Sequence, residues 1–193
     1  MMLALPAAPA PPPRRQVFVG TALAGVAMLM VTGGMLGIWI LMRERAFEAD
    51  GTWVPKDITI PEVASNVMLI GVLAIPLFAQ WAHYAARRGD RGHTGLALGI
   101  VALFTIAIIN AQAFIYADMA MSIDEGGYPG MFYAVTGLTL ALFLFGLGFT
   151  AITAFRFLGG RTSDQELVAA HALYWYVMAV VFAAVWLIVY VTK

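Results

Sequence analysis

The stretch MFYAVTGLTLALFLFGLGFTAI, residues 131–152, decides the fold class because none of its 22 residues is charged. A helix that crosses the hydrocarbon core of a bilayer needs about 20 mainly apolar residues, at about 1.5 Å of rise per residue. The stretch meets that length, although Tyr133, Thr136 and Thr139 interrupt it. The sequence therefore predicts a membrane-spanning helix here and raises the question of whether its polar residues mark a site.

Four more uncharged runs of similar length accompany this one. The chain has 193 residues, of which 62% are hydrophobic and 11% are charged, and a water-soluble domain does not sustain that balance. None of the runs alternates apolar and polar residues as a barrel strand does, and each is too long for one. The prediction is an all-α, polytopic bundle of five transmembrane helices, at residues 17–42, 63–86, 95–116, 131–155 and 172–191.

The domain organisation follows from a shift in composition near the N-terminus. Residues 1–16 are rich in Pro and Ala, so we predict a disordered tail in a polyproline-like state, followed by one transmembrane domain at residues 17–193. The first apolar run is too long for the core of a cleaved signal peptide, and we expect it to stay attached. The absence of cysteine excludes disulfides, thiolate metal ligands and cysteine nucleophiles.

Basic residues are unequally divided between the two faces that five spans define. The face that bears the N-terminus has 7 Lys and Arg residues against 3 Asp and Glu, and the other face has 4 against 8. Because Lys and Arg in short loops stay cytoplasmic, we predict the N-terminus inside and the C-terminus outside. The acidic outer face suits a basic soluble partner such as a c-type cytochrome, and solvated loops without a partner would explain it equally well.

The quoted stretch also contains a candidate contact patch. Tyr133, Thr136 and Gly137 lie at positions i, i+3 and i+4, so they share one small, weakly polar face that a neighbouring helix or a lipid could approach. The alternative is that the threonine hydroxyls bond back to carbonyl groups of their own helix. Gly146 and Gly148, further along, are expected to permit close approach of a second helix.

The last run has an aromatic face that includes Trp175, Phe182 and Trp186, at helical spacing. That face either docks on another subunit or forms an ordinary core or lipid-facing stripe. Four amide side chains lie in or near the spans, and we interpret them as interhelical hydrogen-bonding groups rather than a substrate site. They are Asn66, Gln80, Asn110 and Gln112.

Ionisable side chains are absent from the centres of the five predicted spans. Redox-active and ion-moving membrane subunits depend on such groups, which are costly to bury. The three histidines, His83, His93 and His171, are all predicted at the inner interface, where an imidazole is readily solvated. A haem ligated by His83 and His171 would make the chain a cytochrome b-like electron carrier, and this is an alternative function.

No phosphate-binding loop, metal-ligand cluster or catalytic triad is visible in the sequence, so we predict no catalytic residue and no cofactor in this chain. A small transporter is a further alternative. It is weakened by the missing mid-membrane charge and by the lack of an inverted repeat. No feature indicates a nucleic-acid partner.

Several stretches, in order, resemble subunit III of the haem-copper oxidases, the cytochrome c and quinol oxidases, in its short five-helix form. The resemblance covers nearly the whole chain from Val17 onward. Its residues are the Trp-Pro-rich segment at 53–61, Arg88-Gly89-Asp90, Ala111-Gln112-Ala113, Phe132-Tyr133, Thr136-Gly137 and Tyr174-Trp175. Where the family has two histidines after its Thr-Gly, this sequence has Thr139 and Leu142, and Met28 stands where the family has a membrane-buried Glu.

The resemblance implies an accessory, non-catalytic subunit in a bacterial cytoplasmic membrane. In the family this subunit packs against catalytic subunit I, which holds the haem and copper, and binds phospholipids in a cleft between its helices. It implies that Tyr133, Thr136 and Gly137 belong to the lipid-cleft helix. A related accessory protein of nitric oxide reductases also resembles subunit III and is a further alternative.

Overall fold

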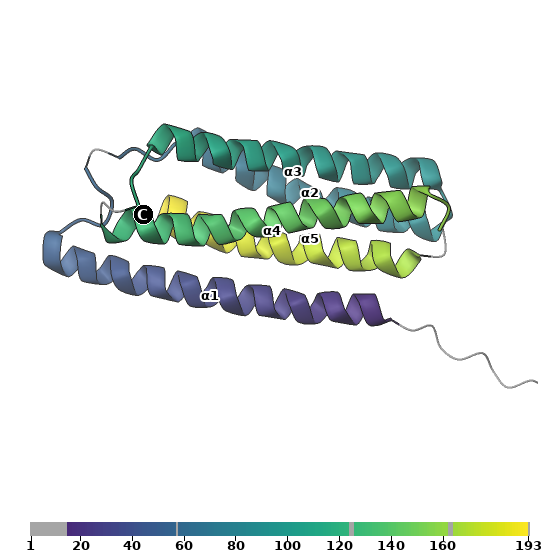
Figure 1. The fold of residues 1–193 in the computed structure, drawn as a ribbon, viewed down its shortest axis with the longest axis horizontal. Helices are drawn as coiled ribbons and strands as arrows, with labels where there is room; N and C mark the ends of the chain where they lie inside the picture. The colour runs from purple at the N-terminus through teal and green to yellow at the C-terminus, as the bar shows by residue number, and fades with distance from the viewer. Residues whose placement is uncertain (1–14, 57, 124–125, 162–163, 193) are drawn as a thin grey trace, which may run out of the picture.

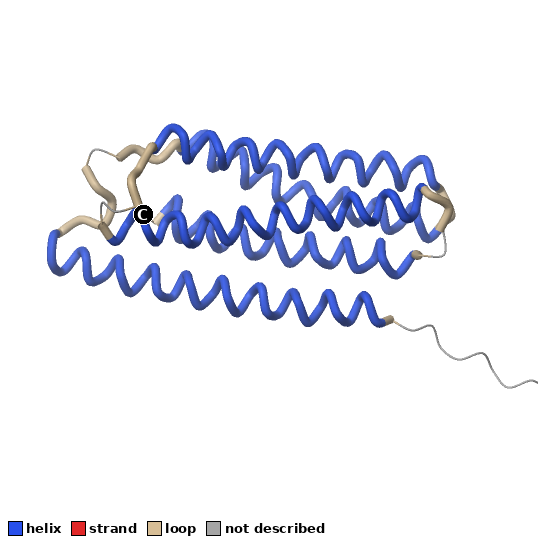
Figure 2. The backbone as a smooth tube through the Cα atoms, viewed as in Figure 1, coloured by secondary structure: helices blue, strands red, loops and turns tan. Residues whose placement is uncertain are grey.

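In the computed structural model, five long helices run side by side along the long axis of the molecule (Figure 1). The structure describes residues 15–56, 58–123, 126–161 and 164–192, and no strand occurs in these ranges (Figure 2). All five helices are long and apolar enough to cross a membrane, which confirms the predicted all-α polytopic class. The elements are α1 (Gln16–Asp50), α2 (Glu62–Arg87), α3 (Arg91–Met119), α4 (Gly127–Leu158), α5 (Gln165–Val185) and the π-helical turn η1 (Trp186–Val191) that continues α5.

The helices extend beyond the uncharged runs that predicted them, because a helix does not end where charged residues begin. The two largest extensions are at the end of α1, which reaches Asp50 rather than residue 42, and at the start of α5, which begins at Gln165 rather than at residue 172. The predicted tail, residues 1–16, lies outside the described residues except for Arg15 and Gln16, and Gln16 is already the first residue of α1.

Local signals fix several of the helix ends. Gly51 adopts a left-handed conformation with φ of 71°, and its N–H bonds to the carbonyl of Phe47, which ends α1. Gly89, also at φ of 71°, turns the chain between α2 and α3. Asp90 then accepts a hydrogen bond of 3.0 Å from the backbone N–H of His93 and caps the start of α3.

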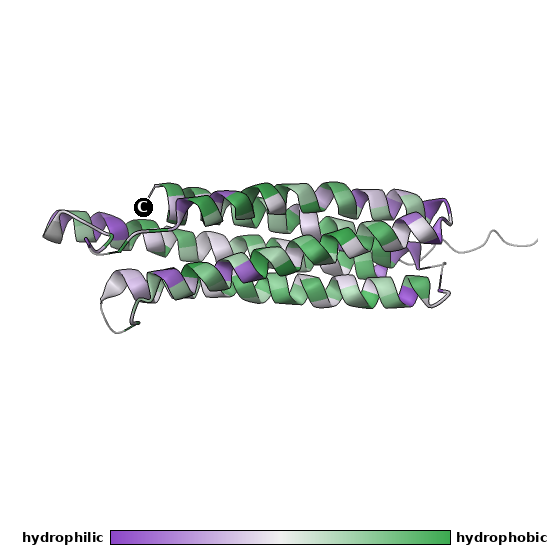
Figure 3. Cartoon of the chain, turned by 90° about the horizontal axis from the view of Figure 1, so that it is seen from above, coloured by the Kyte–Doolittle hydropathy of each residue, from purple (hydrophilic) through white to green (hydrophobic). Residues whose placement is uncertain are grey.

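The helix α5 is the centre of the bundle and packs against α1, α2 and α4. Half of its most apolar segment is buried, against 22% for α1, which lies along one side of the bundle. The α2–α3 pair lies on the side away from α1 (Figure 1). Hydrophilic residues gather at the two ends of the bundle and hydrophobic residues along its length (Figure 3), as a bilayer requires.

The first residue of α1 and the C-terminus lie at opposite ends of the bundle (Figure 1). At the C-terminal end, the loop that follows α1 folds Trp53 back onto the helices. Its ring lies edge-on to Trp39 of α1 and Tyr128 of α4, at centroid distances of 5.3 and 5.4 Å. This cluster closes one end of the core. The direction of the bundle relative to the cytoplasm stays a prediction.

Candidate functional site

Two of the three residues in the predicted patch on α4, Tyr133 and Thr136, hydrogen-bond to α3 or to the segment that follows it. The hydroxyl of Thr136 donates to a carbonyl of its own helix at 2.6 Å and also lies 2.8 Å from the hydroxyl of Tyr116 on α3. The Tyr133 hydroxyl donates to the carbonyl of Met121, after α3, at 3.1 Å. A Cβ atom added at Gly137 would meet nothing within 4 Å, so its surroundings are open. Thr136 therefore back-bonds and bridges two helices at the same time.

The predicted amide Gln112 is buried and accepts a hydrogen bond of 2.9 Å from the hydroxyl of Tyr190, which links α3 to η1 across the core. Asn66 on α2 accepts one of 3.2 Å from the indole of Trp186. Trp175 and Phe182 are fully buried. Trp175 and Phe182 thus belong to this chain's own core, and Trp186 is partly buried at its edge.

His171 was expected at a solvated interface, and the structure corrects this. Because α5 begins six residues before it, His171 lies within the helix and is completely buried. Its Nε2 lies 2.8 Å from the hydroxyl of Thr150 on α4 and 2.9 Å from the indole nitrogen of Trp175. The imidazole thus joins α4 to α5 as part of the core.

Gly146 brings the same two helices together next to this network. A Cβ atom added there would lie 2.7 Å from the ring of Tyr174 and 2.8 Å from that of Trp175, so only glycine fits. This confirms the expected close approach at Gly146. No such close approach is found at Gly148, where an added Cβ atom would meet nothing within 4 Å.

The other two histidines lie at the end of the bundle where α1 begins. His83 is partly buried near the end of α2. His93 is exposed in the first turn of α3, with its Nδ1 2.6 Å from a carboxylate oxygen of Asp90. The backbone N–H of His93, and then its imidazole, hold the pKa of Asp90 below its ordinary value.

These positions do not fit a haem between His83 and His171. The Nε2 atom of His171 is already hydrogen-bonded within the core, and an axial ligand needs that atom free. Among the residues that the structure describes, no group of three or more His, Cys, Asp and Glu side chains could hold a metal ion.

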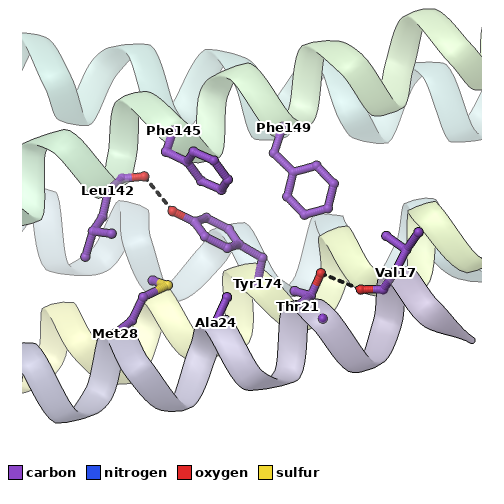
Figure 4. A pocket seen from close by; sticks show the side chains of 9 residues that line it. Val17, Thr21, Ala24, Met28, Leu142, Phe145, Phe149 and Tyr174 are labelled. Atoms are coloured by element: carbon purple, nitrogen blue, oxygen red, sulfur yellow. Dashed lines mark hydrogen bonds between the residues drawn. The ribbon is translucent and has the colours of Figure 1, made fainter.

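An apolar groove of about 470 Å³ lies between α1 and the α4–α5 pair (Figure 4). The side chains of Phe145, Phe149 and Tyr174 form one wall, and the Tyr174 hydroxyl is turned away to donate to the carbonyl of Leu142 at 2.6 Å. The opposite wall is a set of mostly small residues on α1. They are Val17, Gly20, Thr21, Ala24 and Met28.

This groove was not predicted from the sequence. Its α1 residues recur at helical spacing, so they share one face, and that face was the available signal. At the end of the groove near Val17, Glu166 of α5 accepts a hydrogen bond of 3.0 Å from the backbone N–H of Phe18. This bond fixes the start of α1 against α5, although α1 has no side-chain cap of its own.

Comparison with known proteins agrees with the resemblance. The family model for cytochrome c oxidase subunit III matches residues 45–193. The probable cytochrome c oxidase subunit 3 of Rickettsia bellii (strain RML369-C) is 25% identical over 173 residues, which cover 84% of this chain and 58% of that relative. The chain therefore spans less than two thirds of the length of the curated relative it matches. Since the family model matches more than half of the sequence, the chain belongs to the cytochrome c oxidase subunit III family.

Proposed function

We propose that this chain is an accessory, non-catalytic subunit of a bacterial respiratory haem-copper oxidase. It works in the cytoplasmic membrane beside catalytic subunit I, in which the haem and copper are expected. Family membership supports association with an oxidase complex, and the Rickettsia relative supports a bacterial setting.

The observation that carries the proposal is how the chain uses its buried polar groups. Gln112, Thr136 and His171 each hydrogen-bond to a neighbouring helix of the same bundle. No ionised side chain is buried among the described residues. Such a core holds helices of the chain in place, so support of a neighbouring subunit is the function it favours.

The groove between α1 and the α4–α5 pair supports lipid binding as part of this function. From Val17 to Met28 it extends over twelve residues of α1, whose eleven steps of about 1.5 Å give about 16 Å. That length is about half of the ~30 Å hydrocarbon core, which is the depth that the acyl chain of one leaflet occupies. An acyl chain of a membrane phospholipid therefore suits the groove. The open side of Gly137 is a second proposed lipid contact.

We also propose that a c-type cytochrome binds near the outer face, which the sequence predicts to be the more acidic of the two faces. Its basic surface would be attracted to the net negative charge of the loops there. A salt-dependent association of the assembled oxidase with the cytochrome would test this part.

The experiment that tests the main proposal is purification of a tagged chain in a mild detergent. We expect it to co-purify with a haem-bearing subunit, and the chain alone to show no Soret band. Recovery of the chain only as a stable monomer, with no haem-bearing partner, would overturn the proposal.

The lipid part has its own test. Ala24→Phe fills the groove and should lower the occupancy of phospholipid adducts in native mass spectra. Ala27→Phe is the matched control, because Ala27 is exposed on the same helix and does not line the groove. Equal adduct occupancy in the two variants would contradict lipid binding in the groove.

A further inference from the structure

The outward face of α3 is a continuous exposed stripe along the helix. Exposed residues recur on it at alternating spacings of four and three, so they share one side of the helix. Several of them are small, as is common where membrane helices approach closely. They are Gly92, Leu96, Gly99, Leu103, Ile106, Asn110, Ala113 and Ala117.

Asn110 is the unusual member of this face. It lies five residues from the middle of α3 (Arg91–Met119), or about 7.5 Å along the axis, whereas the hydrocarbon core extends about 15 Å on either side of its centre. Its side chain is exposed and makes no hydrogen bond to any residue that the structure describes. An amide at this depth that faces only acyl chains has no hydrogen-bonding partner, which is unfavourable in a membrane.

Two of the other three amides join helices, whereas the third, Gln80 on α2, is exposed and makes no hydrogen bond to a residue that the structure describes. Gln112 turns the opposite way from Asn110 and pairs with Tyr190, and Asn66 pairs with Trp186. In both cases the amide joins two helices. The same chemistry on the outer face of α3 indicates that Asn110 joins this chain to a helix of another.

The surface beside Asn110 is shaped for such a contact. An apolar groove of about 340 Å³ lies between α2 and α3, with Met68 and Gly71 on one wall and Ala107 and Ala111 on the other. Ala107 and Ala111 flank Asn110 along α3, so the amide lies beside the groove. An acyl chain could fill the groove, but it could not hydrogen-bond to the amide. A helix that carries a polar side chain at this depth satisfies both.

We infer that the α2–α3 face docks a transmembrane helix of a partner subunit in the oxidase assembly, with Asn110 hydrogen-bonded to a polar side chain of that helix. The inference rests on the proposed function, because family membership gives the chain an oxidase complex to join. We commit to a partner subunit rather than a second copy for that reason. The docking face lies on the side of the bundle away from α1 and its lipid groove (Figure 1).

The lack of cysteine makes a direct test possible, since a single introduced thiol is unique in the chain. Asn110→Cys, labelled with benzophenone maleimide in native membranes, should photo-cross-link to a partner subunit of the oxidase. Leu144→Cys is the matched control, because Leu144 is 53% exposed near the middle of α4. We expect at least tenfold less cross-linked partner from the control.

Other products would overturn the inference. A cross-linked homodimer would show that the face binds a second copy of this chain, and lipid adducts alone would show that it faces the bilayer. Equal cross-linking to the partner from positions 110 and 144 would show that the α2–α3 face is not a specific docking site. If the control variant co-purifies with a haem-bearing subunit while position 110 gives no partner adduct, the inference fails and the proposed function stands. If neither variant co-purifies with such a subunit, the proposed function itself fails.

A second variant distinguishes the contribution of the Asn110 hydrogen bond from that of side-chain packing. Asn110→Leu keeps a similar volume and removes the amide, so retention of the chain on the complex in a harsher detergent should fall about tenfold, which corresponds to about one interhelical hydrogen bond. Asn110→Gln should restore part of it. Unchanged retention of Asn110→Leu would show that the amide does not anchor the contact.

Discussion

Replacing Gly146 by alanine tests the closest contact in the bundle. The new Cβ would lie 2.7 Å from the Tyr174 ring and 2.8 Å from the Trp175 ring. Ordinary contacts begin near 3.4 Å, so the rings must retreat by about 0.7 Å or α4 and α5 must separate. Either movement weakens the contacts between the two helices at the Thr150 hydroxyl of α4, which lies 2.8 Å from the Nε2 of His171 and 3.3 Å from the indole nitrogen of Trp175 on α5.

The size of the effect follows from these terms. Overpacking of a filled core costs about 1–3 kcal/mol, and a weakened interhelical hydrogen bond adds about 0.6 kcal/mol. The better helix propensity of alanine offsets up to about 1 kcal/mol. We therefore expect Gly146→Ala to lower the free energy of unfolding by about 1–3 kcal/mol, or the apparent Tm by about 2–12 °C for a chain of this size.

The assay is thermal unfolding in detergent, followed by tryptophan fluorescence and by loss of the monodisperse peak. Gly148→Ala is the matched control on the same helix, because an added Cβ there meets nothing within 4 Å. It should leave the Tm unchanged or raise it slightly. Equal destabilisation by the two substitutions, or none by Gly146→Ala, would refute the close approach of α4 and α5.

Three further predictions concern single hydrogen bonds. Tyr190→Phe and Gln112→Leu should each destabilise the fold, with a coupling of about 0.6–2 kcal/mol in a double-mutant cycle of unfolding, because the two side chains share one buried bond. Glu166→Ala should speed hydrogen exchange at Phe18 and protease cleavage near the start of α1, whereas Glu166→Gln, which keeps an acceptor oxygen, should change both less. The pKa of Asp90 is lowered in the folded chain, so its ionised carboxylate stabilises the fold at pH values above the ordinary carboxyl pKa near 4. This stabilisation is lost as the pH falls through the lower pKa of the folded state, and the Tm should fall with it. Asp90→Asn should make the Tm depend less on pH in this acidic range.

Each of these has an outcome that contradicts it. Strictly additive effects of the two substitutions would show that Tyr190 and Gln112 do not interact. Exchange at Phe18 that ignores the substitution at Glu166 would mean that α1 is held by other contacts. An acid limb that persists unchanged in Asp90→Asn would assign the pH dependence to other carboxyl groups.

The sequence was sufficient for the fold class because a bilayer leaves few choices for long uncharged runs. Helices alone satisfy their backbone hydrogen bonds within one segment of lipid-embedded chain, so counting runs was enough to find all five. The ends were harder to predict, since hydropathy marks the edge of the hydrocarbon and not the end of the helix. The start of α5 at Gln165 shows this, and it is why His171 was placed at a solvated interface rather than inside the core.

Which way each polar residue faces could not be derived from the sequence alone. Asn110 and Gln112 are two residues apart on α3, so they differ by about 200° around the helix axis and look alike to any hydropathy window. In the bundle, one pairs with Tyr190 and the other lies on the outer face. The sequence could predict that an amide in a membrane helix hydrogen-bonds to another helix, but not whether that helix belongs to the same chain or to a partner.

The orientation of the amides also explains how one small chain can both stay folded and bind a neighbour. A membrane supplies no strong hydrophobic drive for helices to associate, because lipid tails are as apolar as the side chains. The chain holds its own helices together with close contacts such as Gly146 and with paired groups such as Gln112 and Tyr190. A polar group left on the outside is then the available means of choosing a partner from among many equally apolar surfaces, and Asn110 is placed to make that choice.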